Sequence, residues 1–346
     1  AAVRVAMTVI AKNPSRATLV AVDNQGNTTS TITVERLNTD LTAHADVTQA
    51  TSRPLLANRG LSSQGFTLVG EGFRISHEEG IQLLELSPSH REIVRPLVNG
   101  RDLTTRPRGL FTVDFGLFDE EEAKQQPVLY DLVRVRVKPA REANKREAYS
   151  QYWWRYGEPR PGLRAALMSL RRYIATVETA KHRVFQFLPI NTIAEHSVVC
   201  IALDDAFYLG VLSSAIHVTW ALAAGGTLED RPRYQKALCF DPFPFPDPSP
   251  ELRQQIASIA EQIDQHRKDA LERAEQVTIT GIYNVIEKLR SGEPLSPTER
   301  EVYQLAACGV LLELHNKLDR LVAEAYGWGW PLETEEILTR LVTLNA

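Results

Sequence analysis

The chain has 346 residues, of which 43% are hydrophobic and 24% charged, and its formal net charge is −4. That length suits about two domains with proper cores, and no apolar run approaches the ~18 residues of a membrane span, which excludes a membrane-spanning class. Three distant cysteines, none in a C-x-x-C pair, argue against a disulfide framework and a zinc site and for a reducing compartment, so we expect a cytoplasmic protein.

The first elements predicted along the chain are strands. Val3 to Ile10 and Ala17 to Val22 are short β-branched runs, Thr28 to Val34 alternates, and residues 23–27 have turn composition. The pattern predicts a β-hairpin at the end of a sheet whose other strands would lie upstream. Because the chain opens within a strand-like run, we expect it to be the C-terminal part of a longer protein.

Loops, helices and strands alternate in the next segment. A loop-rich connection from Thr39 to about Ser76 contains Gly70-Glu71-Gly72. This G-x-G favours a turn over a phosphate-binding loop, because Ile75 stands where a third glycine would be needed. Three elements follow: a helix over His77 to Leu86, a strand over Leu110 to Asp114, and an acid-rich helix start at residues 119–122.

Positive charge concentrates between Arg91 and Arg183. This stretch holds 19 Lys+Arg against 12 Asp+Glu, a net charge of +7, so the rest of the chain carries −11. A local basic surface on an acidic protein is typical of a polyanion binder. Charge runs are more often simply solvated faces, and composition alone leaves both interpretations open.

An amphipathic helix is predicted within the basic stretch. From Pro161 onward the apolar residues are spaced alternately four and three apart, which makes one apolar stripe. The stripe consists of Leu163, Leu167, Leu170, Ile174 and Val177. Arg164 and Arg171 are seven residues apart, so they would share a neighbouring face of this helix and remain available to a ligand.

The composition of residues 185–224 predicts elements of a buried core. Phe185 to Leu188 and Val198 to Leu203 have the composition of buried strands, and Ala206 to Ala224 that of a buried helix. Residues 241–250 alternate with proline, which lacks an amide donor and biases its predecessor toward extended geometry. We therefore expect a stiff connector there.

Helices are predicted after the connector. Apolar residues from Leu252 to Ile263 form a helical stripe, and Ser296-Pro297-Thr298-Glu299 is a capping box that opens a helix to about Tyr326. A last helix is expected after Pro331. Residues 241–346 hold 10 Lys+Arg and 18 Asp+Glu, a net charge of −8, which suits a packing or spacing module better than an independent DNA binder.

No complete catalytic constellation is found. The sequence has no G-x-S-x-G, no G-x-x-x-x-G-K-[ST] and no H-E-x-x-H motif. Ser214 and His217 lie in an apolar helix, where packing is favoured over catalysis. Asp204-Asp205 is better interpreted as a turn or a helix N-cap than as a metal-ligand pair. His182 is evenly balanced between a phosphate contact and a surface residue.

Binding features are clearer. Aromatic residues at 149, 152–154 and 156 lie among arginines, a mixture that suits phosphate and base contacts, although at least one of Trp153 and Trp154 is expected to anchor the core. The loop with Pro107 and Gly109 carries three arginines that could bond guanine, or could simply be solvated. A second polar loop, around Arg231, follows Gly225-Gly226.

Six sequence blocks follow one another in the order RPLVNGRDL (95–103), VDFG (113–116), YWWRYGEPRPGLRAAL (152–167), RYIATVETAKHRVFQFL (172–188), YLGVLSSAIHVTWA (208–221) and RYQKALCFDPFPFP (233–246). In this order they resemble the MmeI-like and TaqI-like restriction–modification proteins. The family consists of adenine-N6 DNA methyltransferases in which the specificity domain follows the methyltransferase domain. The resemblance implies duplex DNA as a partner, together with an upstream methyltransferase domain of the same chain.

The sequence departs from the family at the methylation chemistry. The family uses a glycine-containing cofactor loop and an Asn/Asp-Pro-Pro-Tyr/Phe motif, and neither is present. Asp241-Pro242-Phe243 imitates the second, but Phe243 stands where the second proline should be. No catalytic residue and no cofactor are therefore assigned to this chain, and S-adenosylmethionine is implied only for the full-length parent.

Taken together, the sequence predicts a mixed α/β fold in three parts. Residues 1–60 would be the tail of a Rossmann-like methyltransferase domain with a linker, residues 61–240 an α+β DNA target-recognition domain, and residues 241–346 a helical C-terminal domain. The predicted function is sequence-specific recognition of duplex DNA, which positions the DNA for methyl transfer by the upstream domain. The alternative is a protein-interaction scaffold of a phage-defence complex, whose arginine-rich helix binds an acidic surface.

Ten side chains are predicted to contact DNA. The candidates for phosphate contact are Arg155, Arg160, Arg164, Arg171, Lys181 and Arg183. The candidates for base contact are Arg101, Arg106, Arg108 and Arg231. The account requires these cationic side chains to face outward together on one surface that is wide enough for a double helix.

Overall fold

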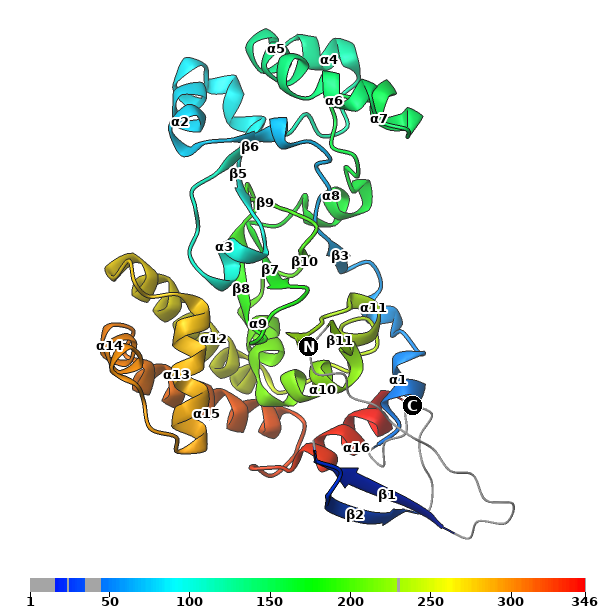
Figure 1. Ribbon diagram of the computed structural model, residues 1–346, viewed down its shortest axis with the longest axis vertical. Coiled ribbons are helices and arrows are strands. Elements are labelled where there is room, and N and C mark those ends of the chain that lie inside the picture. Colours follow the sequence, from blue (N-terminus) through cyan, green and yellow to red (C-terminus); the bar gives the residue numbers. More distant parts are fainter. Residues whose placement is uncertain (1–15, 24, 35–44, 229–230, 346) are drawn as a thin grey trace.

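The computed structural model describes residues 16–23, 25–34, 45–228 and 231–345. The molecule is elongated, with a group of short helices at one end, two small sheets in the middle and longer helices with a terminal hairpin at the other end (Figure 1). The predicted mixed α/β fold is confirmed.

The predicted N-terminal hairpin is present. Strand β1 (Ala17–Val22) pairs antiparallel with β2 (Thr28–Val34), and Asp23 Oδ1 closes the turn by accepting from the amides of Gln25 and Asn27. The predicted strand over Val3 to Ile10 lies outside the described residues.

The central sheet has the strand order β3-β10-β7-β8, with every neighbouring pair antiparallel. Its strands are β3 (Ser62–Gln64), β7 (Arg172–Val177), β8 (Phe185–Pro189) and β10 (Val198–Ile201). The buried strands predicted around residues 185–188 and 198–203 are thereby confirmed.

The prediction of one helix from Pro161 to Val177 is wrong. Helix α8 (Pro161–Leu167) ends early, and β7 follows as a strand. In β7, Tyr173, Ala175 and Val177 belong to one hydrophobic cluster, whereas Ile174 belongs to another. A strand buried on both faces contains apolar residues at every position, so its period of two was hidden behind an accidental helical spacing.

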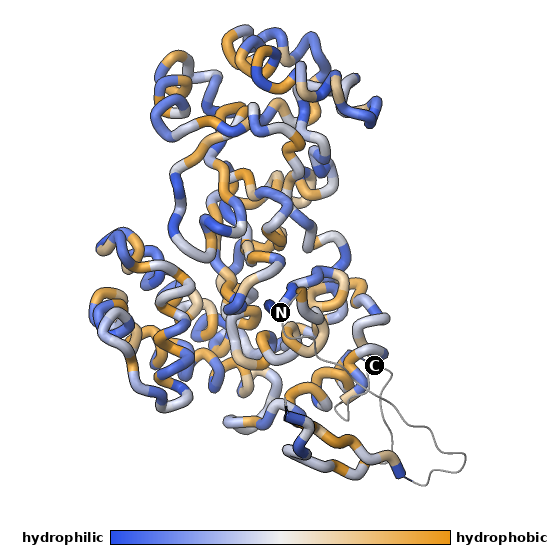
Figure 2. The backbone as a smooth tube through the Cα atoms, viewed as in Figure 1, coloured by the Kyte–Doolittle hydropathy of each residue, from blue (hydrophilic) through white to orange (hydrophobic). Residues whose placement is uncertain are grey.

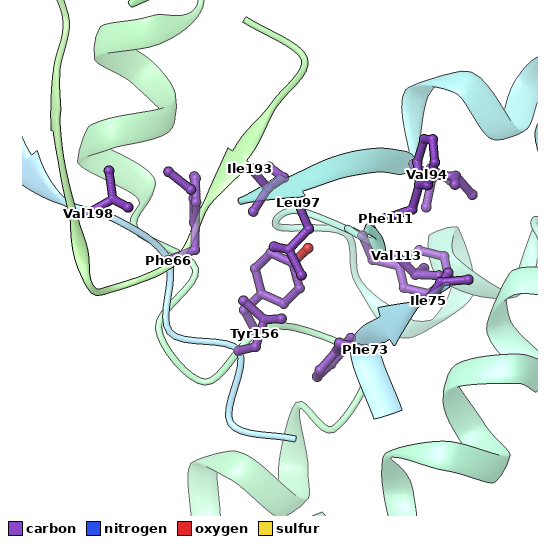
Figure 3. Close-up of a cluster of buried hydrophobic side chains, with 14 of the residues drawn as sticks. Phe66, Phe73, Ile75, Val94, Leu97, Phe111, Val113, Tyr156, Ile193 and Val198 are labelled. Atoms are coloured by element: carbon purple, nitrogen blue, oxygen red, sulfur yellow. The ribbon is translucent and has the colours of Figure 1, made fainter. Parts of the chain in front are cut away.

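A second sheet has the order β4-β6-β5-β9, antiparallel except for the parallel pair β5–β9. Its strands are β4 (Arg74–Ile75), β5 (Val94–Val98), β6 (Phe111–Val113) and β9 (Ile193–Ala194). The core between the sheets includes Phe66, Phe73 and Tyr156 (Figure 3). The Tyr156 hydroxyl is 2.9 Å from Thr112 Oγ1, so this buried polar group is satisfied.

Short helices cover the far end of this sheet (Figure 1). They are α2 (His77–Leu86), α4 (Glu120–Lys124), α5 (Pro127–Arg136), α6 (Lys138–Glu142) and α7 (Glu147–Gln151), with 3₁₀ turns η2 (Glu71–Phe73) and η3 (Pro88–Glu92). The predicted helix at His77 and the acid-rich start after Asp119 are confirmed, and Asp119 forms a capping box with Glu122.

The buried helix predicted over residues 206–224 is two helices. Helix α9 (Ala206–Ser213) and helix α10 (Ala215–Gly225) meet at a bend of 64°. Asp205 caps α9, as predicted, and Ser214 ends the first helix by capping the second. Within the described part of the chain, no single helix is long and apolar enough to span a membrane. The bent pair of α9 and α10 has the length and the composition for it, and nothing else indicates a span.

The C-terminal half is helical. It contains α11 (Lys236–Cys239), α12 (Pro250–Arg273), α13 (Ile279–Ser291), α14 (Pro297–Leu305), α15 (Cys308–Ala325) and α16 (Thr334–Asn345). The longer helices alternate between hydrophilic and hydrophobic residues, as helices with one buried face do (Figure 2). The predicted capping box of Ser296 and Glu299 is present, but its helix breaks before Ala307, whose φ of 44° is left-handed.

The proline-rich residues 241–249 form neither helix nor strand, yet they are built into the core. Phe243 is fully buried, and Asn58 donates to the carbonyl oxygens of Phe240, Asp241 and Phe243. The Tyr326 hydroxyl donates to the Pro244 carbonyl at 2.7 Å. One hydrophobic cluster therefore runs from α1 (Val47–Thr51) and α10 through this segment to α16.

The remaining short elements are the 3₁₀ turn η1 (Leu56–Asn58), helix α3 (Gly100–Thr104), and the two-stranded hairpin β11 (Thr227–Leu228) and β12 (Arg231–Pro232).

Two buried histidines make acid sensitivity an expected property. Burial, with smaller effects of Arg183 and Arg267, lowers the pKa of His217 and of His315 to about 3. Since the unfolded chain would protonate both near the ordinary value of 6.5, their contribution to stability is complete above that pH. Below that pH, the contribution of each histidine to the free energy of unfolding declines by up to about 1.4 kcal/mol for each pH unit of acidification.

We expect the ring signals of His217 and His315 to stay unchanged between pH 8 and pH 5 in NMR titrations of the folded chain. The free energy of unfolding of the wild type should fall over the same range. Titration midpoints near pH 6 for these two rings would contradict the assignment.

Candidate nucleic-acid interface

An open groove of about 750 Å³ lies at the C-terminal end of strand β7. It is formed by α3, the end of β7, the turn between β9 and β10, and the hairpin β11–β12. We call it the basic groove, and its lining residues are Asn99, Gly100, Arg101, Thr104, Val177, Glu178, Thr179, His196, Ser197, Leu228, Arg231 and Arg233.

Helix α3 is fixed at its N-terminus. The Asn99 side chain accepts from the amides of Arg101 and Asp102, and Asp102 Oδ2 accepts from the Asn99 amide at 2.9 Å, so the two residues form a capping box. The Gly100 amide donates to Ser197 Oγ at 2.9 Å. A Cβ atom at Gly100 would lie 2.9 Å from Val177 Cγ1, which explains why the helix begins with glycine at this close approach.

The opposite wall, hairpin β11–β12, is attached to the central sheet through the backbone. The Ala180 amide donates to the Pro232 carbonyl at 3.3 Å, and the Tyr234 amide donates to the Glu178 carbonyl at 2.6 Å. Where the hairpin begins, a Cβ atom at Gly225 would lie 2.0 Å from the Arg233 carbonyl oxygen, so only glycine fits there. Both walls of the basic groove are therefore held by specific contacts.

Two of the four predicted base readers meet in this groove. Arg101 and Arg231 are exposed, and neither guanidinium has a side-chain hydrogen bond or ion pair to any residue that the structure describes. They extend from opposite walls, one from α3 and the other from β12. The groove thus presents two uncommitted guanidinium groups, the side chain that most often makes bidentate contacts with guanine.

The other charges in the groove neutralise each other. Glu178 accepts from Arg233 Nε at 2.7 Å and from Gln64 Nε2 at 2.9 Å, so both of its oxygens are occupied. The exposed His196 adds a further polar group on the turn before β10. Because Arg233 is paired, the excess positive charge comes from Arg101 and Arg231.

The other two predicted base readers, Arg106 and Arg108, make hydrogen bonds and ion pairs within the protein. Arg108 makes a bidentate ion pair with the buried Asp102, at 2.8 and 2.9 Å. Burial is the largest single effect on Asp102 and raises its pKa. The hydrogen bonds from Arg108 and from the Asn99 amide, with the charge of Arg108, together outweigh it, so the pKa of this carboxyl lies below its usual value. Arg106 Nη1 donates to the carbonyl oxygens of Ala274 and Val277, at 2.7 and 3.2 Å.

Two of the six predicted phosphate contacts are internal cross-links. Arg183 is buried, stacks over the Tyr234 ring and donates to the carbonyl oxygens of Val177 and Pro232. Burial lowers its pKa to about 10. Arg164 makes a bidentate pair with the buried Asp114, at 2.8 and 2.7 Å. Both guanidinium groups are already bonded to groups within the protein.

Two more phosphate candidates, Arg160 and Arg155, already make contacts within the protein. Arg160 pairs with Glu158 at 2.5 Å, and Arg155 donates to the Phe118 carbonyl at 2.7 Å while stacking on Tyr152. These arginines hold the backbone around α8. The expectation that all the basic side chains face outward on one concave surface is therefore not met.

The remaining two phosphate candidates lie at opposite ends of the central sheet. Lys181 lies beside the basic groove, because a small cavity that it lines shares Thr104 and Val177 with the groove. Its ion pair with Glu287, at 3.0 Å, is more than half exposed and therefore weak. Arg171 is exposed and precedes β7, roughly 20 Å from the groove for a six-residue strand.

The aromatic residues around position 153 build the core. Trp153, Trp154 and Tyr156 are buried, as predicted for at least one tryptophan, whereas Tyr152 is 40% exposed. His182 is half-buried, with Nε2 2.8 Å from Asn284 Oδ1, so it is not a free phosphate contact.

Sequence reasoning did not single out His196 and Ser197, two polar residues of the groove. Ser197 fixes α3 through Gly100, and His196 lies next to it on the groove wall. They come from a turn almost 100 positions after α3, so no local pattern connected them with Arg101. The only sequence signal was that a polar pair, His196-Ser197, separates two buried strands.

The described residues contain no group of three His, Cys, Asp or Glu side chains that could hold a metal ion. Ser214 and His217 are core residues, as expected: Ser214 caps α10, and His217 Nε2 is 3.1 Å from the Tyr234 hydroxyl. Cys200, Cys239 and Cys308 are buried free thiols.

Comparisons with known proteins agree with a recognition role. The family model described as "MmeI, target recognition domain" matches residues 45–247. DNA methyltransferase A of Bacillus subtilis (strain 168) is 28% identical over 137 residues, which are 39% of this chain and 13% of that protein.

One solved structure shares the fold of almost the whole chain. It is described as the Type IIL restriction-modification enzyme MmeI in complex with DNA, and it matches with a TM-score of 0.69 and 19% identity over 96% of this chain. The match covers 41% of that chain, so this sequence spans less than half the length of the protein it resembles.

Proposed function

Because the chain belongs to the MmeI target recognition domain family, we propose that it is the duplex-DNA recognition module of an adenine-N6 DNA methyltransferase of the restriction–modification type. In this proposal, a methyltransferase domain upstream in the same protein flips the adenine and transfers a methyl group from S-adenosylmethionine. This chain supplies the sequence specificity and holds the DNA in register.

The observation that supports the proposal most strongly is the basic groove with its two free guanidinium groups. A guanidinium can donate two parallel hydrogen bonds to O6 and N7 of guanine, and each such contact discriminates against a wrong base by about 1–3 kcal/mol. Arg101 and Arg231 sit on short, anchored elements whose backbones are fixed before DNA arrives. We therefore assign base contact to these two residues.

Phosphate contacts are assigned to the rim of the same groove. Lys181 gives up an exposed ion pair with Glu287 and an exposed hydrogen bond to Asn284 Oδ1 when it turns to a phosphate, so its cost of binding is small. His196 lines the groove beside α3 and can donate a hydrogen bond to a backbone oxygen.

The test is to measure binding of the 346-residue chain to duplexes of random sequence at several salt concentrations, followed by selection from a pool of randomised duplexes. We expect retention that falls steeply with salt and enrichment of a sequence with at least one guanine. Indifference to DNA at low salt would overturn the proposal and favour a protein partner.

Replacing Lys181 with alanine should lower the slope of log K against log salt by about one, uniformly across sequences, because one phosphate contact is lost. Lys317→Ala is the matched control, since Lys317 is an exposed lysine on α15 within the acidic helical segment. An unchanged slope for Lys181→Ala would remove this residue from the interface. A decrease for Arg171→Ala would show that the contact extends along the whole of β7.

A further inference from the structure

We propose that the corner between helices α12 and α13, residues 274–280, positions the base-reading helix α3, and that Arg106 is the positioning residue that joins them. The inference rests on the proposed function, because it concerns how Arg101 is held for base contact. It assigns a part in sequence recognition to a segment that lies outside the residues matched by the family model.

The corner contacts the C-terminal end of α3 directly. The Ile279 amide donates to the Thr105 carbonyl at 3.2 Å, and Thr280 Oγ1 donates to the Thr104 carbonyl at 2.8 Å. In the other direction, Arg106 Nη1 donates to the carbonyl oxygens of Ala274 and Val277. The last carbonyl groups of a helix have no partner within it, and here the corner supplies partners for two of them.

These contacts lead back to Arg101 in one further step. Thr105 Oγ1 donates to the Arg101 carbonyl at 2.7 Å, and the Thr105 amide donates to the same oxygen at 2.9 Å. A shift of the corner would therefore move the backbone from which the Arg101 side chain extends.

A helix of five residues needs such support. Helix formation is unfavourable for so short a segment, so α3 keeps its geometry only through what it packs against. Ser197 and the capping box fix its N-terminus, and the 274–280 corner fixes its C-terminus. Because a guanidinium must meet two atoms of one base, small displacements of α3 would reduce discrimination before they reduce attraction to phosphate.

The corner is itself firmly held. Arg267 Nη2 donates to the Phe185 carbonyl at 2.7 Å, and Lys268 Nζ donates to the Phe187 carbonyl at 3.1 Å, so α12 is bonded to the edge strand β8. Both side chains also pair with the buried Asp264. Thr278 caps α13 through the Gly281 amide at 3.0 Å. Helix α12 thus transmits the position of the sheet to the corner and from there to α3.

The geometry distinguishes this role from base reading. To contact a base, Arg106 would have to leave two carbonyl oxygens, one of them at 2.7 Å. Arg101 makes no such contacts and is free to do so. The two arginines therefore have different expected phenotypes, although both lie in the same short segment.

The experiment compares Arg106→Ala and Arg106→Lys with the wild-type chain, using random duplex and selection from the randomised pool. For Arg106→Ala we expect affinity for random duplex and the salt slope to stay within about twofold of wild type. The preference for the selected sequence should fall at least about tenfold, at every enriched position together. Arg106→Lys should recover much of that preference, since an ammonium group can donate to the same carbonyl oxygens.

A second pair of variants keeps the test decisive if Arg106→Ala does not fold. Thr280→Val removes the hydroxyl that bonds the Thr104 carbonyl while keeping the shape, and should lower the preference about threefold. Thr343→Val removes the same kind of hydroxyl-to-carbonyl bond on α16 and should change nothing.

Three results would overturn the inference. Unchanged preference in Arg106→Ala would deny any role, and loss at a single base position would make Arg106 a base reader. Equal loss of random and selected binding without rescue by lysine would make its role merely structural. Absence of any sequence enrichment by the wild-type chain would instead show that the proposed function itself has failed.

Discussion

The double variant Arg101→Ala/Arg231→Ala is expected to lose its sequence preference almost completely, and to lose a smaller share of its affinity for duplex DNA of random sequence because the groove also loses two positive charges. Each guanidinium can contribute about 1–3 kcal/mol of discrimination, so removing both should lower the preference by between about thirtyfold and about 20,000-fold. The double variant should fold like the wild type, because both side chains are exposed and have no side-chain partner among the described residues.

The measurement is selection from a randomised duplex pool by each single variant and by the double variant. Each single variant should relax its own base position and leave the other intact, because the two arginines extend from separate elements. Arg134→Ala on α5, an exposed arginine paired only with Asp131 at 3.0 Å, serves as the control and should select the wild-type sequence. A double variant that retains the wild-type preference would refute the assignment of base contact to the groove.

Arg164→Ala is expected to destabilise the chain by about 3–5 kcal/mol, which is the usual cost of leaving one partner of a buried ion pair uncompensated. The Asp114 side chain is only 3% exposed, and both of its oxygens are bonded to Arg164. The guanidinium also stacks on Phe66 at 4.6 Å and donates to the Pro159 carbonyl at 2.8 Å. Its removal therefore affects the core between the two sheets.

Denaturant unfolding would measure this effect, with Asp114→Asn/Arg164→Ala as the informative companion. The double variant should be more stable than Arg164→Ala alone, because the buried carboxylate is neutralised together with the lost partner. If Arg164→Ala unfolds like the wild type but lowers the salt slope of DNA binding by about one, the residue contacts phosphate after all.

Local chemistry allowed much of the fold to be predicted. The turn around Asp23, the acid-rich helix start at residues 119–122, the cap at Asp205 and the capping box at Ser296 each depend on residues a few positions apart, and all are present. Strand β7 was missed because burial on both faces removes the alternation that marks a strand.

Predicting the site from charge was less successful, for a physical reason. Whether an arginine is free depends on partners distant in sequence: Asp114 is 50 positions from Arg164, and Ala274 is 168 positions from Arg106. The richest basic stretch therefore consists largely of cross-links that hold short elements together. Among the described residues, Arg101 and Arg231, like Arg171, lack such partners, and composition does not reveal this.

The proline-rich segment is part of a buried core that continues into the C-terminal helices, so the polypeptide cannot be shortened at this segment without exposing apolar surface. A fragment that ends at residue 247, where the family match stops, would lose α12. The apolar surface around Phe207 and Val211, which that helix helps to cover, would then face water. Such a truncated product should aggregate and be degraded by proteases. The smallest fragment that could be moved into another protein as a recognition module must therefore retain the helices through α16.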